Sequence, residues 1–332
     1  MADLSIKYLG LTLANPIIIG SCGKTSNIKS LKELQKQGAA AVVLKSIFEE
    51  QIMMEIDAQY NNLLNSNVFY SEKSENIDYL DLNVTHDAMN NYISLIKEAK
   101  RELIIPVIPS IHCHSTGEWL NFVKEIEKAG ADAIEINLGF IQTDPNIGAV
   151  ATEMELISII KKIRATVKLP IAVKISPYVS SIPAFVNELS LAGANAVVLF
   201  TRFYNPDIDI IKLEEKPGPI FSSELDYSNT LRWTGILSGK TPTQIVSSTG
   251  IHNAETIIKM ILAGASAVQI ASILYIQEAT VIQEILKGLN QYMDSKNFNY
   301  ISQFNGLFNR KSTKNIGIFD RIQFMKHVGS IE

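Results

Sequence analysis

Two lysines follow strongly apolar runs that offer nothing to solvate an ammonium group. Lys45 ends the run AAAVVLK, and Lys174 lies in PIAVKIS. Because a buried amine is costly without a partner, we expect an anionic group or a ligand beside each lysine. Asn137 ends the equally apolar run AIEIN, and its amide adds hydrogen-bonding groups. Together the three residues predict a site for an electron-rich ligand; the alternative is a structural pair between a lysine and a carboxylate such as Glu135.

A phosphate site is predicted from the segment SSTGIHNAET, residues 247–256. Thr249 and Gly250 precede a predicted helix, and backbone N–H groups at such a turn, together with the helix dipole, attract phosphate. The segment QIASILY offers Ala271 and Ser272 as a neighbouring half of the same site. With the lysines, this turn indicates a phosphate-bearing ligand.

The elements that must position these residues repeat along the chain. Four segments share a Gly-Ala pair followed by an apolar run: QGAAAVVLKS, AGADAIEINL, AGANAVVLF and AGASAVQIAS. We expect each glycine to end a helix in the left-handed conformation, which only glycine adopts at low cost. Fully apolar runs of this kind predict parallel strands that are covered on both faces.

Further runs bring the predicted strands to eight, namely the four repeats and residues 15–21, 106–113, 170–176 and 243–251. Between them, apolar residues at three- and four-residue spacing predict helices over residues 27–37, 86–103, 117–130, 151–165, 181–193, 228–240, 254–264 and 278–293. Eight strands that alternate with eight helices predict an α/β fold, a (β/α)8 TIM barrel. A doubly wound open sheet is the alternative, but no Gly-x-Gly-x-x-Gly follows the first strand.

Two insertions, residues 48–84 after strand 2 and 203–226 after strand 6, follow strand ends on the face where barrel enzymes build their sites. We expect one barrel domain over residues 1–303 and a C-terminal packing segment of the same domain over 304–332. Within that segment FDRIQFMKHV is predicted to be helical.

Composition argues against several classes of protein. The 332 residues carry a net charge of −4, which gives no basic footprint for nucleic acid or anionic lipid. The two cysteines, Cys22 and Cys113, suit free thiols in a reducing compartment. The N-terminus lacks the pattern of a signal peptide, and the longest apolar run, residues 260–276, is too short and too interrupted to span a bilayer. We expect a soluble cytoplasmic protein without a metal site.

The chain resembles the flavoprotein dihydroorotate dehydrogenases over most of its length. The motifs that carry the resemblance are NPIIIGS, VVLKS, EINL, VKISPY, TLRWTGIL and TGIHNAET…LAGASAVQIAS. It implies an FMN-binding barrel that oxidises dihydroorotate to orotate in pyrimidine biosynthesis and that is usually a homodimer.

The resemblance also implies roles for individual residues. Lys45 and Asn137 would lie at the reaction centre, and Lys174 would lie by the flavin N1–O2 edge, where a fixed cation stabilises the reduced form. The residues that would contact the cofactor are Ser21, Lys45, Ser46, Asn137, Lys174, Thr201, Ser222, Ser223, Thr249, Gly250, Ala271 and Ser272.

Several positions depart from the family pattern. The family places a Cys or Ser in the loop after strand 4, where it removes the proton from dihydroorotate as hydride passes to flavin N5; here Phe140 stands at this base position. Gln142 replaces an Asn that binds substrate, and Thr201-Arg202 replaces an Asn-Thr or Asn-Ser pair. The Asn-containing loop after strand 2 is not reproduced. The chain is therefore most similar to the dihydroorotate dehydrogenase-like subgroup that keeps the flavin site and lacks the usual base.

Three functions remain open at this point. The first is an FMN-dependent oxidoreductase that uses dihydroorotate or a related hydride donor, with Cys22, His112 or His114 as a substitute acid or base. In this case Arg202 would grip a substrate carboxylate; the alternative is an ion pair with Asp207 or Asp209. The second is an FMN-binding protein without dehydrogenase turnover, and the third is a flavin-free lyase that uses Lys174 or Lys45 as a Schiff-base amine. A homodimer is expected, and an electron-transfer partner subunit is one of the open electron acceptors.

Overall fold

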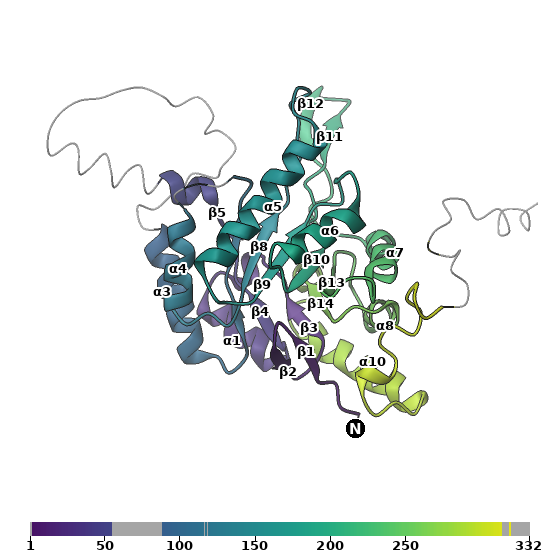
Figure 1. The fold of residues 1–332 in the computed structure, drawn as a ribbon. Coiled ribbons are helices and arrows are strands. Elements are labelled where there is room, and N and C mark those ends of the chain that lie inside the picture. The colour runs from purple at the N-terminus through teal and green to yellow at the C-terminus, as the bar shows by residue number, and fades with distance from the viewer. Residues whose placement is uncertain (1, 55–87, 116, 118, 314–318, 320–332) are drawn as a thin grey trace, which may run out of the picture.

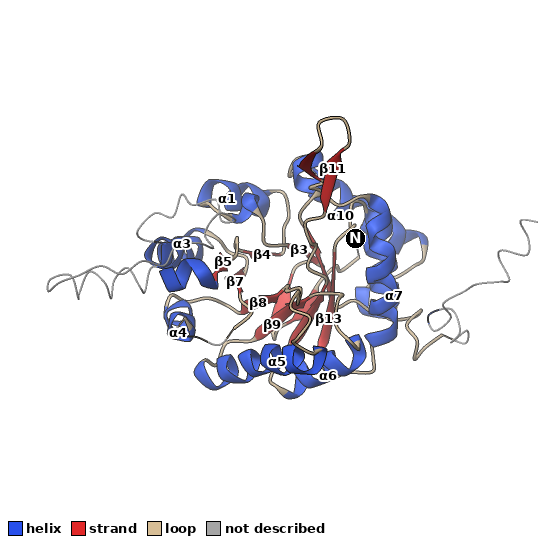
Figure 2. Cartoon of the chain, turned by 90° about the horizontal axis from the view of Figure 1, so that it is seen from above, coloured by secondary structure: helices blue, strands red, loops and turns tan. Residues whose placement is uncertain are grey.

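The computed structural model describes residues 2–54, 88–115, 117, 119–313 and 319. Within these residues, eight parallel strands form the centre of the molecule (Figures 1 and 2). In chain order they are β3 (Ile17–Ile19), β4 (Ala41–Val43), β6 with β7 (Val107–Ile108 and Ser110–His112), β8 (Ile134–Leu138), β9 (Ile171–Ile175), β10 (Ala196–Leu199), β13 (Gln244–Ser248) and β14 (Ala267–Ile270).

The strands close into a barrel. β14 pairs with β3, so the last strand lies beside the first. β6 and β7 are two parts of one barrel strand, interrupted at Pro109, whose nitrogen has no hydrogen to donate. β6 pairs with β4, and β7 pairs with β8 and with the short strand β5 (Ile47–Phe48). The predicted (β/α)8 barrel is confirmed.

Helices surround the strands, as the view from above shows (Figure 2). They are α1 (Ile28–Lys36), α3 (Ala88–Glu102), α4 (Leu120–Lys128), α5 (Ala149–Thr166), α6 (Ile182–Leu191), α7 (Tyr227–Leu237), α8 (Ala254–Ala263) and α10 (Val281–Ser295). Each overlaps one of the predicted helices. A short helix α9 (Ile273–Ile276) follows β14, and 3-10 turns lie at Gly23–Thr25, Glu224–Asp226 and Ile301–Gln303. In the described part of the chain, no helix has the length and apolar character needed to cross a bilayer.

The Gly-Ala repeats have the predicted geometry. Gly264 ends α8 with φ of +105°, and Gly38 has φ of +102° after α1. Gly130 and Gly193 also have positive φ. The repeats therefore mark the places where a helix stops and the chain turns back into the barrel.

A hairpin closes the barrel at the N-terminal ends of its strands. It consists of β1 (Ile6–Tyr8) and β2 (Leu11–Leu13), which lie below the strands in Figure 1. Tyr8 is buried in a cluster with apolar residues of the barrel interior such as Ile18 and Val198. The Leu9 backbone N–H donates to the Gln244 side chain at the start of β13 (2.8 Å). With this end closed by packing, a ligand must enter from the opposite end.

The insertion after β10 forms a ribbon of its own. β11 (Pro206–Asp209) and β12 (Glu214–Pro217) pair antiparallel and project above the barrel (Figure 1). The sequence did not predict these strands. Residues 55–87, which hold most of the other insertion and the altered loop after strand 2, lie outside the described residues.

The beginning of the C-terminal segment packs on the barrel helices. Phe304 is buried, and the backbone N–H groups of Gly306 and Phe308 donate to carbonyl groups of α8. The Phe319 ring lies so close to Gly235 of α7 that a Cβ there would come within 2.5 Å of it. Except for Phe319, the predicted helix FDRIQFMKHV lies outside the described residues.

Candidate functional site

A cavity of about 210 Å³ opens at the C-terminal ends of the strands. Most of the residues predicted for a cofactor lie along its walls: Ser21, Asn137, Lys174, Thr201, Ser222, Thr249, Gly250, Ala271 and Ser272, together with Arg202. Most of them lie near the ends of β3, β8, β9, β10, β13 and β14, so the fold brings together residues as far apart in the chain as Ser21 and Ser272.

Asn137 has a fixed orientation in the cavity wall. Its Oδ1 accepts hydrogen bonds from the Gly139 backbone N–H (3.1 Å) and from the Thr201 hydroxyl (2.6 Å). Because the oxygen is used in this way, the NH2 group is the part of the amide that remains for the cavity. Gly139 is required here, since a Cβ would lie 2.6 Å from the Thr201 methyl carbon. Asn137 therefore offers donors to a ligand.

Lys174 is half-buried at the cavity floor, and its ammonium donates to Gln269 Oε1 (3.1 Å). The Gln269 amide nitrogen in turn donates to Glu135, which is fully buried. Burial raises the pKa of the Glu135 carboxyl, and the Lys174 charge and the Gln269 hydrogen bond act against this rise. The predicted alternative was a lysine paired with Glu135. In the structure the Gln269 amide lies between the two charged groups and hydrogen-bonds to both. Sequence reasoning missed Gln269, because only the closed barrel brings β14 across to β8 and β9.

The turn after β13 has two residues with positive φ in succession, Thr249 (+76°) and Gly250 (+72°). Positive φ is costly for a β-branched residue, and the Thr249 hydroxyl is held by the Phe200 carbonyl (3.1 Å). A Cβ on Gly250 would lie 2.2 Å from the Tyr227 nitrogen at the start of α7. The turn thus brings backbone N–H groups and the beginning of α7 to one end of the cavity.

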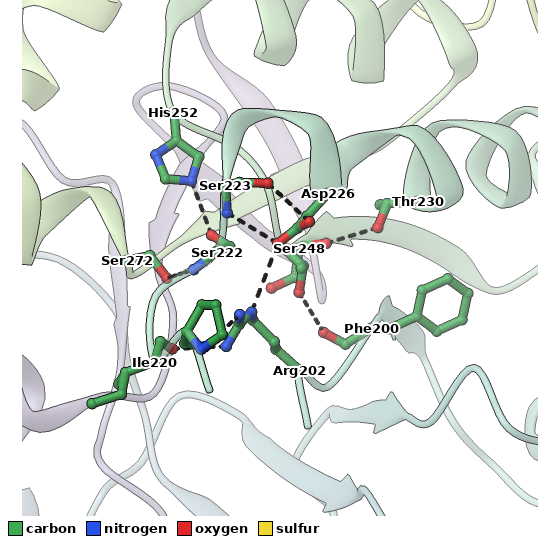
Figure 3. Close-up of polar contacts among 12 residues, drawn as sticks. Phe200, Arg202, Ile220, Ser222, Ser223, Asp226, Thr230, Ser248, His252 and Ser272 are labelled. Atoms are coloured by element: carbon green, nitrogen blue, oxygen red, sulfur yellow. Dashed lines mark hydrogen bonds and ion pairs between the residues drawn. The ribbon is translucent and has the colours of Figure 1, made fainter. Parts of the chain in front are cut away.

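A serine–histidine pair lies beside this turn (Figure 3). Ser222 Oγ and His252 Nε2 are 2.9 Å apart, and the Ser222 backbone N–H donates to Ser272 Oγ (3.1 Å). His252 is buried, and desolvation lowers its pKa against the opposing charges of Glu224 and Asp226. His252 lies within the predicted phosphate motif, but its own contact with Ser222 was not predicted.

Arg202 is held by the loop that precedes α7 (Figure 3). Its guanidinium donates to the carbonyl oxygens of Ile220 (2.7 Å) and Pro219 (2.8 Å), and Nε lies 3.8 Å from Asp226. The predicted alternative partners, Asp207 and Asp209, are not the residues it meets. Arg202 also borders a second cavity of about 550 Å³, which shares Phe200, Thr201 and Thr249 with the first and contains Ser223 in its wall. Ser223 is exposed and hydrogen-bonded to Asp226.

Lys45 and Ser46 lie apart from the main cavity. Lys45 is exposed, so the prediction that it is buried is wrong: its strand ends before it, and the side chain turns to solvent. Both residues line a separate cavity of about 280 Å³. Ser46 Oγ connects the two places, because it lies 3.0 Å from Ser21 Oγ and 2.8 Å from the buried Ser110 Oγ.

Phe140, which the resemblance predicts to stand at the base position, packs face to face on His114 with ring centroids 5.3 Å apart. His114 Nδ1 lies 3.6 Å from both Glu49 and Glu50. A phenyl ring cannot accept a proton, and in this conformation it covers one face of the nearest imidazole. The side-chain oxygen of Gln142 accepts a hydrogen bond from the Asp144 backbone N–H (2.9 Å).

Of the proposed substitute bases, His112 is the one with a ring nitrogen that has no hydrogen-bond partner among the described residues, although His112 does not line the main cavity. Its Nε2 lies 3.1 Å from the Gly139 carbonyl, which can only accept, so Nε2 carries the hydrogen. Nδ1 is then a lone pair, and it is buried without a hydrogen-bond partner among the described residues. Burial lowers the pKa of His112, which keeps it neutral. Burial raises the pKa of the Cys22 thiol, which opposes a thiolate there.

The comparison with protein families decides where this barrel belongs. The family model described as dihydroorotate dehydrogenase matches residues 3–293. The chain belongs to the dihydroorotate dehydrogenase family. It is 29% identical over 316 residues to a protein of Thermoplasma volcanium described as dihydroorotate dehydrogenase B (NAD(+)), catalytic subunit, with 92% of this chain and 99% of that protein covered. Proteins with the same description from Thermoplasma acidophilum (26% identity, 92% and 99% covered) and Pyrococcus furiosus (24%, 92% and 98%) are also similar. The chain is thus a dihydroorotate dehydrogenase-like member of an oxidoreductase family.

Proposed function

We propose that this dihydroorotate dehydrogenase family member binds FMN in the cavity at the barrel mouth and is an FMN-dependent oxidoreductase whose hydride donor is related to dihydroorotate. The observation that carries the proposal is the donor set of one cavity. Lys174 and the Asn137 NH2 group lie toward β8 and β9, and the Thr249–Gly250 turn with Ser272 lies toward β13 and β14. Such donors suit a ligand that is anionic at one end and rich in acceptors at the other.

When bound, FMN supplies a hydride acceptor at N5 and gains negative charge at its N1–O2 edge. The ammonium of Lys174 would stabilise that charge, and a hydrogen bond to Gln269 holds the ammonium in place. The amide of Asn137 would donate to the ring from the neighbouring strand, with its orientation fixed by Thr201 and Gly139. Ser272, Ser222 and the turn at Thr249 and Gly250 would hold the phosphate.

The residues around Phe140 support a donor other than dihydroorotate. Neither Phe140 nor its neighbour Gly139 can take a proton, and Gln142 is used within its own loop. His112 is the remaining candidate for holding a proton, through an unpartnered Nδ1 that is buried beside the main cavity's residue Asn137 on the neighbouring strand. An FMN-binding protein without turnover is the second candidate, and the same Phe140 favours it.

The lyase alternative is less well supported. A Schiff-base lysine must be available as a neutral amine, often in an apolar pocket. Lys174 instead donates to Gln269 next to the buried Glu135, and Lys45 is exposed.

The test is a visible spectrum of the purified protein, followed by anaerobic titration with dihydroorotate. We expect flavin absorption that is retained through gel filtration, and little bleaching by dihydroorotate compared with dithionite. A protein that remains colourless after incubation with FMN would contradict the proposal. A bound flavin that no candidate donor reduces would favour the second candidate function, an FMN-binding protein without turnover.

We also propose that the chain forms a homodimer and passes electrons to a partner subunit. The relatives' description as catalytic subunits supports such a partner. Affinity purification from the native source, followed by identification of co-purifying redox proteins, tests this assignment.

A further inference from the structure

The inside of the barrel contains a buried carboxylate to which the proposed function gives no role. Glu135 lies in β8 with no exposed surface, two residues before Asn137. Its Oε1 has no hydrogen-bond partner among the described residues. Ala133 and Ala172, on the same and the next strand, belong to the apolar cluster of the barrel interior. A carboxylate in such surroundings is costly unless a nearby charge compensates it.

The compensation reaches Glu135 through one amide. Gln269 extends from β14, donates its NH2 group to Glu135 Oε2, and accepts from the Lys174 ammonium at Oε1. The reverse orientation of this amide would place its oxygen against the carboxylate and its NH2 group against the ammonium. When Glu135 is ionised, the two charges therefore select a single orientation for Gln269. Gly20 leaves room for it, since a Cβ there would lie 3.3 Å from Gln269 Oε1.

This arrangement sets both the place and the effective charge of Lys174. The ammonium is tied at the cavity floor by a side chain that is 2% exposed. The negative charge one amide away offsets part of the positive potential that Lys174 creates in the cavity, because screening inside a protein is weak. Glu135 does not line the cavity, so its hydrogen-bonded connection to a ligand there runs through Gln269 and Lys174.

We propose that Glu135 is a positioning residue: through Gln269 it fixes the Lys174 ammonium in the cavity wall, and its charge lowers the reduction potential of the bound FMN. The inference rests on the proposed FMN site. Lys174 alone would stabilise the anionic reduced flavin and raise the potential, and Glu135 opposes part of this effect. The hydrogen-bonded chain consists of Glu135, Gln269 and Lys174, and the missing side chain of Gly20 leaves room for Gln269.

Two variants act on the potential in opposite directions. Glu135→Gln removes the charge and keeps an oxygen that can accept from Gln269, so we expect a more positive potential. Gln269→Leu removes the bridge and leaves Lys174 free to turn toward Glu135, so we expect a more negative potential. The expected change for each is about tenfold or more in the equilibrium between oxidised and reduced flavin, which is about 30 mV for a two-electron couple.

The potentials are measured on the FMN-loaded protein by slow anaerobic reduction with a reference dye. Asp132→Asn is the matched control, because it removes one carboxylate charge at the other end of β8, where Asp132 pairs with Lys100 (2.6 Å). We expect its potential to equal that of the unmodified protein. Equal potentials for Glu135→Gln and Asp132→Asn would overturn the proposal, and so would a shift of the same sign in Glu135→Gln and Gln269→Leu.

A second measurement needs no flavin and separates this inference from the proposed function. Urea unfolding of the apoprotein at pH 8 compares Lys174→Met, Glu135→Gln and the double variant. Lys174→Met leaves Glu135 uncompensated, so we expect its denaturation midpoint to lie below that of the double variant. If FMN fails to bind but this order holds, the proposed function is wrong and the coupling stands. If the shifts in denaturation midpoint of the two single variants add up to that of the double variant, Glu135 and Lys174 are not coupled and the proposal is wrong.

Discussion

At the scale of single residues, Asn137 and Phe140 lie three positions apart and have different surroundings. Asn137 is held by hydrogen bonds that turn its NH2 group to the cavity. Phe140 is held by ring stacking on His114 and is absent from the cavity wall. The loop therefore offers donors to a ligand at Asn137 and, at Phe140, a side chain that cannot move a proton.

Restoring a thiol at position 140 should not restore dihydroorotate oxidation. In Phe140→Cys we expect flavin reduction by dihydroorotate to remain near the background rate, because the sequence also departs from the substrate-binding pattern that the resemblance predicts and because Arg202 is engaged by Pro219 and Ile220. The measurement is the anaerobic decay of flavin absorbance in a stopped-flow instrument, with Phe140→Leu as the control. A gain of roughly 100-fold over that control, the size of a general-base contribution, would show that the base alone was lacking.

The buried His252 predicts how stability depends on pH. Desolvation lowers its pKa in the folded protein, so below about pH 6.5 the unfolded chain binds more protons than the folded one. The free energy of unfolding is then highest above this pH and falls as the pH drops through it. His252→Gln can still meet Ser222 but cannot titrate, so we expect a shallower fall between pH 6.5 and 5 in urea unfolding. A fall as steep as that of the unmodified protein would contradict this role.

At the scale of elements, the turn between β13 and α8 combines two demands on Gly250. Its φ is +72°, and a Cβ would meet the Tyr227 nitrogen at 2.2 Å. Gly130 has φ of +90° but open space around the same position, so Gly130→Ala measures the backbone cost alone. We expect Gly130→Ala to cost about 1–2 kcal/mol. Gly250→Ala should cost more and should also weaken FMN binding, as urea unfolding and flavin fluorescence would show. Equal losses in the two variants would mean that α7 does not constrain the turn.

The elements of the barrel could be predicted because their sequence pattern is local. Eight apolar runs and eight amphipathic segments alternate, and each Gly-Ala repeat marks the end of a helix by its positive φ. The β11–β12 ribbon could not be predicted in this way. Its residues are mostly exposed, so no burial imposes an alternating pattern on them.

The candidate site was predictable to the extent that it consists of residues at strand ends. Asn137, Lys174 and the Thr249–Gly250 turn meet in one cavity, as their places in the strands implied. Lys45 shows the limit, because β4 ends at Val43 and Lys45, two residues later, is exposed. The relay from Glu135 to Lys174 was hidden for another reason: Gln269 connects strands that are not neighbours, and sequence gives no sign of contacts across a barrel interior.

At the scale of the whole molecule, the two ends of the barrel differ in what they leave exposed. The β1–β2 hairpin covers one end with apolar packing. The other end has the cavity and, beside it, the β11–β12 ribbon, which is paired with no other strand in the described residues. A two-stranded ribbon alone is only marginally stable in water. Its aliphatic side chains at Ile208, Ile210, Ile211 and Leu213 are exposed, Ile211 to 90%.

We therefore expect the ribbon to pack against a second copy of the chain in the proposed homodimer. The double change Ile210→Asp and Ile211→Asp places charge at the tip and should convert the dimer to a monomer in sedimentation velocity measured at micromolar concentration. FMN binding should persist, because residues 206–217 do not line the main cavity. The matched control is Ile104→Asp, a similarly exposed isoleucine on the connection between α3 and β6. If the unmodified protein is a monomer, there is no such interface. If the dimer survives the changes at the ribbon tip but is lost in Ile104→Asp, the interface lies elsewhere.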